Sequence, residues 1–77
     1  MKKKIYEILK ETFPKRKIPK TFNGLKIGYY QEWDSLAHLN FMLSIERKFK
    51  IKFSLKEFSS LSDIKSIHKS VKNKKNV

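Results

Sequence analysis

The sequence predicts an all-α fold, a small four-helix bundle in which three helices are long, one is short and the first connection is a long loop. Two observations predict it. Apolar residues recur at spacings of three and four in several stretches, and residue types that cap helix starts precede most of these stretches. The length of 77 residues, 39% of them apolar, suits one domain, so we expect residues 1–77 to fold as a unit.

The first helix is predicted over residues 2–13, where Ile5, Ile8, Leu9 and Phe13 share one face and Pro14 ends the pattern. Residues 14–34 contain both prolines and both glycines and show no sustained period, which predicts a long loop. A disordered linker would not be so rich in large apolar residues. The loop is therefore expected to pack on the core through Ile18, Phe22, Leu25, Ile27, Tyr29, Tyr30 and Trp33.

The second helix has the strongest helical pattern, and the chain is organised around its start. We predict this helix from about Ser35 to Phe49. Asp34 and Ser35 are residue types that accept hydrogen bonds from the free N–H groups of a first turn, although no Glu or Gln follows at capping-box spacing. The apolar stripe predicted to face the core consists of Leu36, Leu39, Met42, Leu43 and Phe49, broadened by Ile45.

Residues 50–53 alternate polar and apolar but have no pairing partner, so they are predicted to form an extended connector. Ile51 and Phe53 are expected to turn inward from it. Ser54 and Glu57 then have the spacing of a capping box, which predicts the start of the short third helix. Its two inward-facing residues are expected to be Phe58 and Leu61.

A fourth helix is predicted to follow, capped by either Ser62 or Asp63. Its core face is expected to contain Ile64, Ile67 and Val71. The lysine- and asparagine-rich residues 72–77 are predicted to form a frayed basic tail.

Neither a catalytic residue nor a metal site is expected. A serine hydroxyl needs an activating base, and His38, three residues after Ser35, has no orienting third group or oxyanion pocket near it in the sequence. We therefore expect His38 and His68 to be surface residues. The absence of cysteine excludes disulfides and thiolate metal sites, and two histidines and seven scattered acids give no ligand-like spacing.

The chain resembles the acyl carrier proteins, a family of phosphopantetheine-binding carriers, over almost its full length. The resemblance is carried by Trp-Asp-Ser-Leu at residues 33–36, by an apolar helix ending in Glu-x-x-Phe-x-Ile-x-Phe at residues 46–53, and by the final helix. It implies that Ser35, flanked by Asp34 and Leu36, carries a covalent 4′-phosphopantetheine arm. Acyl groups would be bound as thioesters to the thiol of that arm. A separate phosphopantetheinyl transferase would install the arm from coenzyme A with Mg²⁺, and the carrier itself would not be an enzyme.

The chain departs from this family in its charge. Acyl carrier proteins are usually acidic, and their partners place basic patches on acidic residues along the second helix. Here Asn40, Arg47 and Lys48 stand at positions where acids are common, and Glu46 alone remains acidic. We expect partner docking at these four residues, by the transferase and by acyl-activating, acyltransferase or synthase enzymes of a fatty-acid-like or specialised pathway. Asp34 would either help to hold the transferase's Mg²⁺ or only cap the helix.

The net charge of +12 supports an alternative hypothesis, a small basic helical module that binds nucleic acid or anionic lipid without a prosthetic group. Only Arg16 and Arg47 among the nineteen basic residues are arginines, the side chain that suits phosphate and base recognition. The lysines also run from end to end of the sequence, so no nucleic-acid partner is expected. The apolar run from Phe41 to Leu43 is far too short to span a membrane. We expect a soluble, cytoplasmic monomer.

Overall fold

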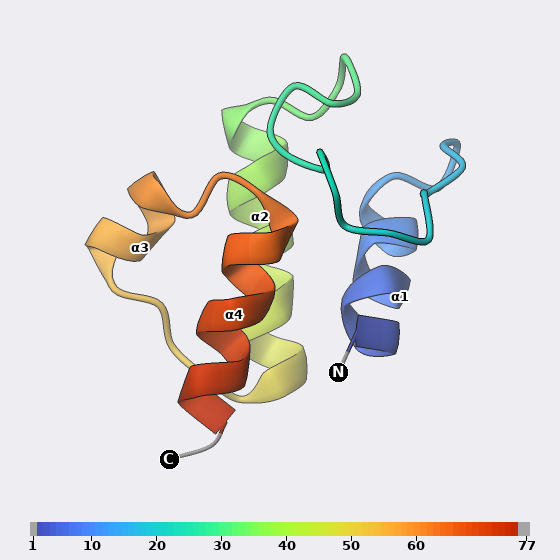
Figure 1. Ribbon diagram of the computed structural model, residues 1–77. Helices are drawn as coiled ribbons and strands as arrows, with labels where there is room; N and C mark the ends of the chain where they lie inside the picture. Colours follow the sequence, from blue (N-terminus) through green and yellow to red (C-terminus); the bar gives the residue numbers. More distant parts are fainter. Residues whose placement is uncertain (1, 76–77) are drawn as a thin grey trace.

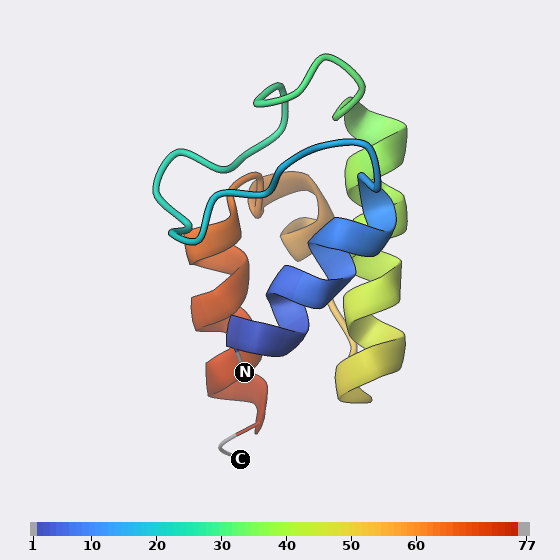
Figure 2. The same ribbon diagram turned by 90° about the vertical axis from the view of Figure 1, so that its right-hand side faces the viewer.

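Four helices form the chain in the computed structural model, which describes residues 2–75 (Figure 1). They are α1 (Lys2–Thr12), α2 (Ser35–Phe49), α3 (Leu55–Ser60) and α4 (Ile64–Lys75). No strand occurs within this range, so the predicted all-α class with one short helix is confirmed. α2 and α4 run in the same direction, whereas α1 lies across one side of this pair and runs in the opposite direction (Figures 1 and 2). None of the helices in residues 2–75 is long and apolar enough to cross a membrane.

The core lies between α1, α2 and α4 and beneath the loop of residues 14–34. α3 contributes no fully buried residue and packs against the core through partly buried Phe58. The buried apolar side chains are Ile5, Ile8, Leu9, Phe13, Ile18, Phe22, Leu25, Tyr30, Trp33, Phe41, Met42, Ile45, Phe49, Phe53, Ile64, Ile67 and Val71.

The bounds of α2 match the prediction, but its buried face matches only in part. Leu36 and Leu39, which were predicted to face the core, are 67% and 41% exposed. Met42, Ile45 and Phe49 are buried as predicted, and the other two buried residues of α2 are His38 and Phe41. All five lie at spacings of three and four and so form a stripe rotated from the predicted one. The helix is apolar on more than one side, and the rotation leaves two leucines exposed near its first turn.

The loop of residues 14–34 is packed, as predicted. Five of its apolar residues are buried and Ile27 is half-buried, although Tyr29 is 47% exposed. The loop is fastened to the start of α4 by an isolated antiparallel bridge between Lys26 and Asp63. Two hydrogen bonds flank this bridge, from the N–H of Ile64 to the carbonyl of Leu25 at 2.9 Å and from the N–H of Ile27 to the carbonyl of Ser62 at 3.1 Å.

The connector between α2 and α3 begins at Lys50, which has a left-handed backbone with φ 57° and donates its N–H to the carbonyl of Glu46. That conformation is uncommon outside glycine and asparagine, and it ends the helix. Phe53 is buried and Ile51 is half-buried, as expected. The capping box of Ser54 and Glu57 is present at the start of α3, which confirms the sequence prediction.

α4 begins after Asp63, whose carboxylate accepts a hydrogen bond from the N–H of Ser66 at 3.3 Å. Asp63 rather than Ser62 is therefore the cap. The frayed tail predicted from residue 72 is wrong for residues 72–75, which are helical, while residues 76 and 77 lie outside the described residues. Side chains of this last turn reach other helices, because Lys74 bonds Glu57 at 2.9 Å and Lys75 donates to the carbonyl of Phe49 at 3.3 Å.

Candidate functional site

Ser35 is the first residue of α2 and is exposed. Asp34 is the N-cap, with an extended backbone, and its Oδ1 accepts the N–H of Ala37 at 2.9 Å. Within residues 2–75, no side-chain hydrogen bond involves the Ser35 hydroxyl. The N–H groups of Ser35 and Leu36 belong to the first turn and have no acceptor within the helix, so the hydroxyl lies at the positive end of the macrodipole.

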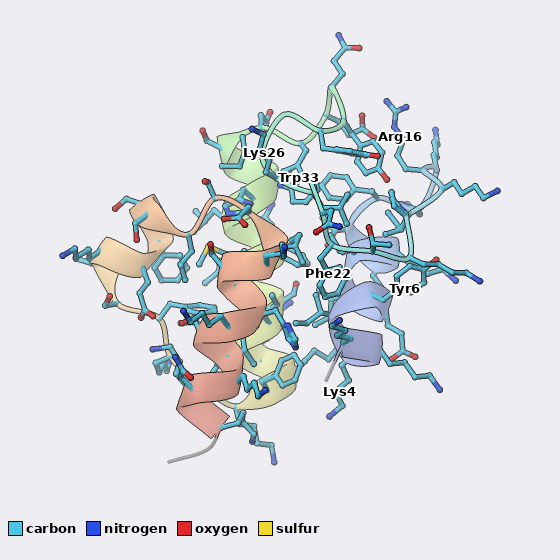
Figure 3. All side chains as sticks on the ribbon, in the orientation of Figure 1. Lys4, Tyr6, Arg16, Phe22, Lys26 and Trp33 are labelled. Carbon is cyan, nitrogen blue, oxygen red and sulfur yellow. The ribbon has the colours of Figure 1, made fainter. Side chains whose placement is uncertain are left out.

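Trp33 anchors the backbone immediately before this serine. Its side chain is only 1% exposed and its ring lies 4.9 Å from that of Phe13 and 6.2 Å from those of Tyr30 and Phe41, measured between centroids. Its carbonyl accepts the N–H of Gly28 at 2.9 Å, and its own N–H donates to Tyr30 at 3.0 Å. The aromatic cluster therefore joins the residue after α1, the loop and α2, and Trp33 lies at the end of the molecule where α2 starts (Figure 3).

His38 is buried, so the prediction that it lies on the surface was wrong. Its side chain is 3% exposed because it completes this cluster: Nδ1 accepts the indole N–H of Trp33 at 3.0 Å, and Nε2 lies 2.7 Å from the carbonyl oxygen of Leu61. Since a carbonyl can only accept, Nε2 must carry the hydrogen and donate it. Both ring nitrogens are thus occupied, and neither can take a proton from Ser35.

A second fastening holds the loop on its outer side. The guanidinium of Arg16 donates to both carboxylate oxygens of Glu32, at 2.8 and 2.7 Å, and lies over the ring of Tyr30. The hydrogen bond from Arg16 lowers the pKa of Glu32 to about 2. Both partners are nearly half exposed, so the pair fixes the geometry of the loop more than it adds to stability.

The exposed face of α2 next to Ser35 contains an apolar patch. Leu36 and Leu39, one turn apart, are its two exposed leucines, and Asn40 is exposed beside them. Farther along the helix, Arg47 and Lys48 are also exposed. Sequence reasoning missed this patch because it assigned both leucines to the core.

Glu46, the fourth residue predicted to dock partners, has a contact within the chain. Its carboxylate accepts the N–H of Phe53 at 2.7 Å, which holds the connector after α2 against the helix. Lys48 lies 3.9 Å from Glu11 of α1, and Arg47 donates to the hydroxyl of Ser44 at 3.2 Å. The structure thus places Asn40, Arg47 and Lys48 on the surface and half-buries Glu46.

The contact between Trp33 and His38 was not found from the sequence, although a signal for it exists. A buried indole N–H needs an acceptor, and His38 follows Trp33 at five residues, one turn into the helix.

The residues that the structure describes include no group of three or more His, Cys, Asp or Glu side chains that could hold a metal ion. Comparisons of the chain with protein-family models, with curated proteins and with solved structures found no match.

Proposed function

We propose that this chain is an acyl carrier protein whose Ser35 carries 4′-phosphopantetheine and thereby presents acyl groups to partner enzymes. The observation that carries the proposal is the exposed, unbonded hydroxyl of Ser35 at the start of α2, on a backbone anchored by buried Trp33. The four-helix order and the long packed loop support it, since both agree with the acyl-carrier-protein-like bundle that the sequence predicts. The proposed site of action is the cytoplasm.

The residues around Ser35 suit a phosphodiester. The hydroxyl would supply the oxygen through which the group is attached, and the free N–H groups of the first turn favour negative charge there. When bound, the group supplies a terminal thiol on a flexible arm. The carboxylate of Asp34 already holds the N–H of Ala37, which supports its role as the cap that fixes the direction of Ser35.

We propose that a separate transferase carries out the attachment, because His38 cannot serve as a base while both its nitrogens are engaged. The transferase and the acyl-transferring enzymes would dock beside Ser35 on Leu36 and Leu39, with Asn40 next to them. Apolar side chains supply most of the energy in such contacts, and the surrounding charges govern the choice of partner. A partner that extends to Arg47 and Lys48 should be neutral or acidic where it meets them.

The test is intact-mass measurement after incubation with coenzyme A, Mg²⁺ and a phosphopantetheinyl transferase of broad specificity. The wild type should gain one phosphopantetheine and Ser35→Ala none. Ser54→Ala is the matched control, because Ser54 also stands exposed at a helix start but caps α3. This control should be modified as fully as the wild type. Modification that persists in Ser35→Ala, or its absence from the wild type, would refute the site.

A second candidate is a basic module that binds an anionic partner and has no prosthetic group. One observation favours it: lysines of three helix ends lie together, far from Ser35. The mass measurement separates the two candidates, because only the carrier requires modification.

A further inference from the structure

Lysines that are spread along the sequence gather at one end of the molecule. The start of α1 and the ends of α2 and α4 lie together at this end, opposite the start of α2 (Figure 2). Lys4 marks this end, whereas Arg16, Lys26 and Trp33 lie toward the other (Figure 3). We call the end the basic pole and define it by six exposed lysines, Lys2, Lys3, Lys4, Lys48, Lys50 and Lys75.

Five of these six lysines line one open hollow of about 670 Å³, and Phe49 lies between them. Glu7 is the one carboxylate among the residues that line this hollow. Lys4 and Lys75 approach Phe49 from different helices, Lys4 over its ring at 5.6 Å and Lys75 at its carbonyl. Positive charge is therefore concentrated here in space, contrary to the even spread that the sequence suggested.

The side of the molecule next to the pole is also positive. Lys2, Lys20, Lys65 and His68 line a hollow of about 310 Å³ beside Phe22. Burial lowers the pKa of His68, and the neighbouring charges of Lys2 and Lys72 lower it further. Positive charge thus extends beyond the pole, along the side of the molecule next to the N-terminus of α1.

Helix stability does not explain the lysines of α1. The last turns of α2 and α4 contain basic residues where the macrodipole favours them. The first turn of α1 contains three lysines and no acid, at the helix end where positive charge is unfavourable. A bound anion would turn this unfavourable placement into a favourable one.

We propose that the basic pole docks on the surface of an anionic lipid bilayer. Lysine predominates at this end, where Arg47 in the last turn of α2 is the one exposed arginine among residues 2–75. The compact ammonium groups of lysine suit a fluid layer of negative headgroups that needs no fixed geometry. The large apolar side chains that are most exposed in residues 2–75, Tyr29, Leu36, Leu39 and Leu55, lie outside the pole. The pole therefore lacks the apolar anchors of a protein interface and would bind without insertion. In this orientation Ser35, at the other end, faces solution.

The test uses the unmodified full chain and sedimentation with vesicles, so that its outcome is independent of modification at Ser35. Vesicles of phosphatidylcholine alone are compared with vesicles containing phosphatidylglycerol, at low salt and at about 0.15 M salt. The pole variant combines Lys2→Gln, Lys3→Gln, Lys4→Gln and Lys50→Asn, the last because asparagine tolerates the left-handed backbone. The matched control combines Lys15→Gln, Lys17→Gln, Lys26→Gln and Lys56→Gln, which are exposed lysines outside the pole.

Each variant loses four positive charges, from +12 to +8, so that net charge is matched between them. The wild type should bind only the anionic vesicles, more weakly at the higher salt. The pole variant should lose roughly fivefold in affinity for each lysine that lies near the headgroups, and the control far less. Equal losses in both variants would show that net charge alone is responsible and would overturn the proposal. So would the absence of binding by the wild type, or tighter binding to an oligonucleotide than to the vesicles under the same conditions.

Discussion

His38 joins three parts of the chain, because it accepts from Trp33 in the loop and donates to Leu61 after α3 while belonging to α2. His38→Leu replaces the imidazole with an apolar side chain that still fills the space. It leaves the buried indole N–H of Trp33 and the carbonyl of Leu61 without hydrogen-bond partners. Each such orphan costs about 1–3 kcal/mol, so we expect the free energy of unfolding to fall by about 2–4 kcal/mol. Denaturant unfolding followed by the fluorescence of Trp33 measures this directly.

The control for His38 is His68→Leu, at a half-buried histidine whose ring meets the edge of Phe22 at 5.9 Å. It should change the free energy of unfolding by less than about 1 kcal/mol. Equal effects of the two substitutions would mean that the hydrogen bonds of His38 are not responsible for the loss of stability.

His38 also shows a limit of prediction from sequence. Its burial depends on Trp33 and Leu61, and spacing along one helix cannot reveal partners on other segments.

At the scale of elements, α3 has no fully buried residue, and polar contacts of Glu57 add to the packing of Phe58 in holding it. The carboxylate of Glu57 accepts the N–H of Ser54 at 2.8 Å, the Ser70 hydroxyl at 2.9 Å and Lys74 at 2.9 Å, so it closes the capping box and links α3 to α4. The hydrogen bond from Ser54, followed by those from Lys74 and Ser70, lowers the pKa of Glu57 to about 2.

Because the folded state lowers this pKa, the ionised carboxylate stabilises the fold above the ordinary value near 4.5. That contribution should be lost as the pH falls from about 5 to about 2. Glu57→Gln should cost about 1–2 kcal/mol at pH 7 and flatten the decline in acid. Unfolding at pH 7, 5, 4 and 3 tests this, with Glu32→Gln as the control at the more exposed carboxylate. A decline equally steep in Glu57→Gln and the wild type would contradict the assignment.

The elements themselves were predicted well because their signals are local. The polar residues at the start of α2 and the capping-box spacing of Ser54 and Glu57 predicted where these helices start. The structure has Asp34 as the N-cap of α2 and Ser54 as the N-cap of α3. The orientation of α2 was not predictable in the same way, because its apolar residues form two overlapping stripes. Packing against α1 and the loop decides which stripe is buried. Leu36 and Leu39, which are not in the buried stripe, form the exposed patch beside Ser35. The same limit applies to the tail of α4, whose helical state depends on Glu57 and Phe49 of other elements.

At the scale of the whole molecule, the two proposed sites, Ser35 and the basic pole, were accessible to sequence reasoning to different degrees. Ser35 was identified from a short contiguous motif at a helix start, and the structure leaves it exposed. The basic pole depends on how three helix ends meet, and its lysines are as far apart in the sequence as Lys2 and Lys75. A net charge of +12 gives the amount of positive charge but not its position. The fold supplies the position.

The same clustering makes a prediction about stability in salt. Nineteen basic residues face seven acids, so repulsion should outweigh the exposed ion pairs, and screening should raise the free energy of unfolding by about 1 kcal/mol between low salt and about 0.15 M NaCl. The pole variant removes charge from lysines that line one hollow, and it removes the positive charge that opposes the macrodipole at the start of α1. It should therefore exceed the wild type in stability at low salt and depend less on salt. The matched control removes equal charge from lysines outside the pole and should retain most of the salt dependence. If denaturant unfolding gives both variants the same stability at low salt, the repulsion arises from net charge, and the lysines of the pole oppose folding no more than any others do.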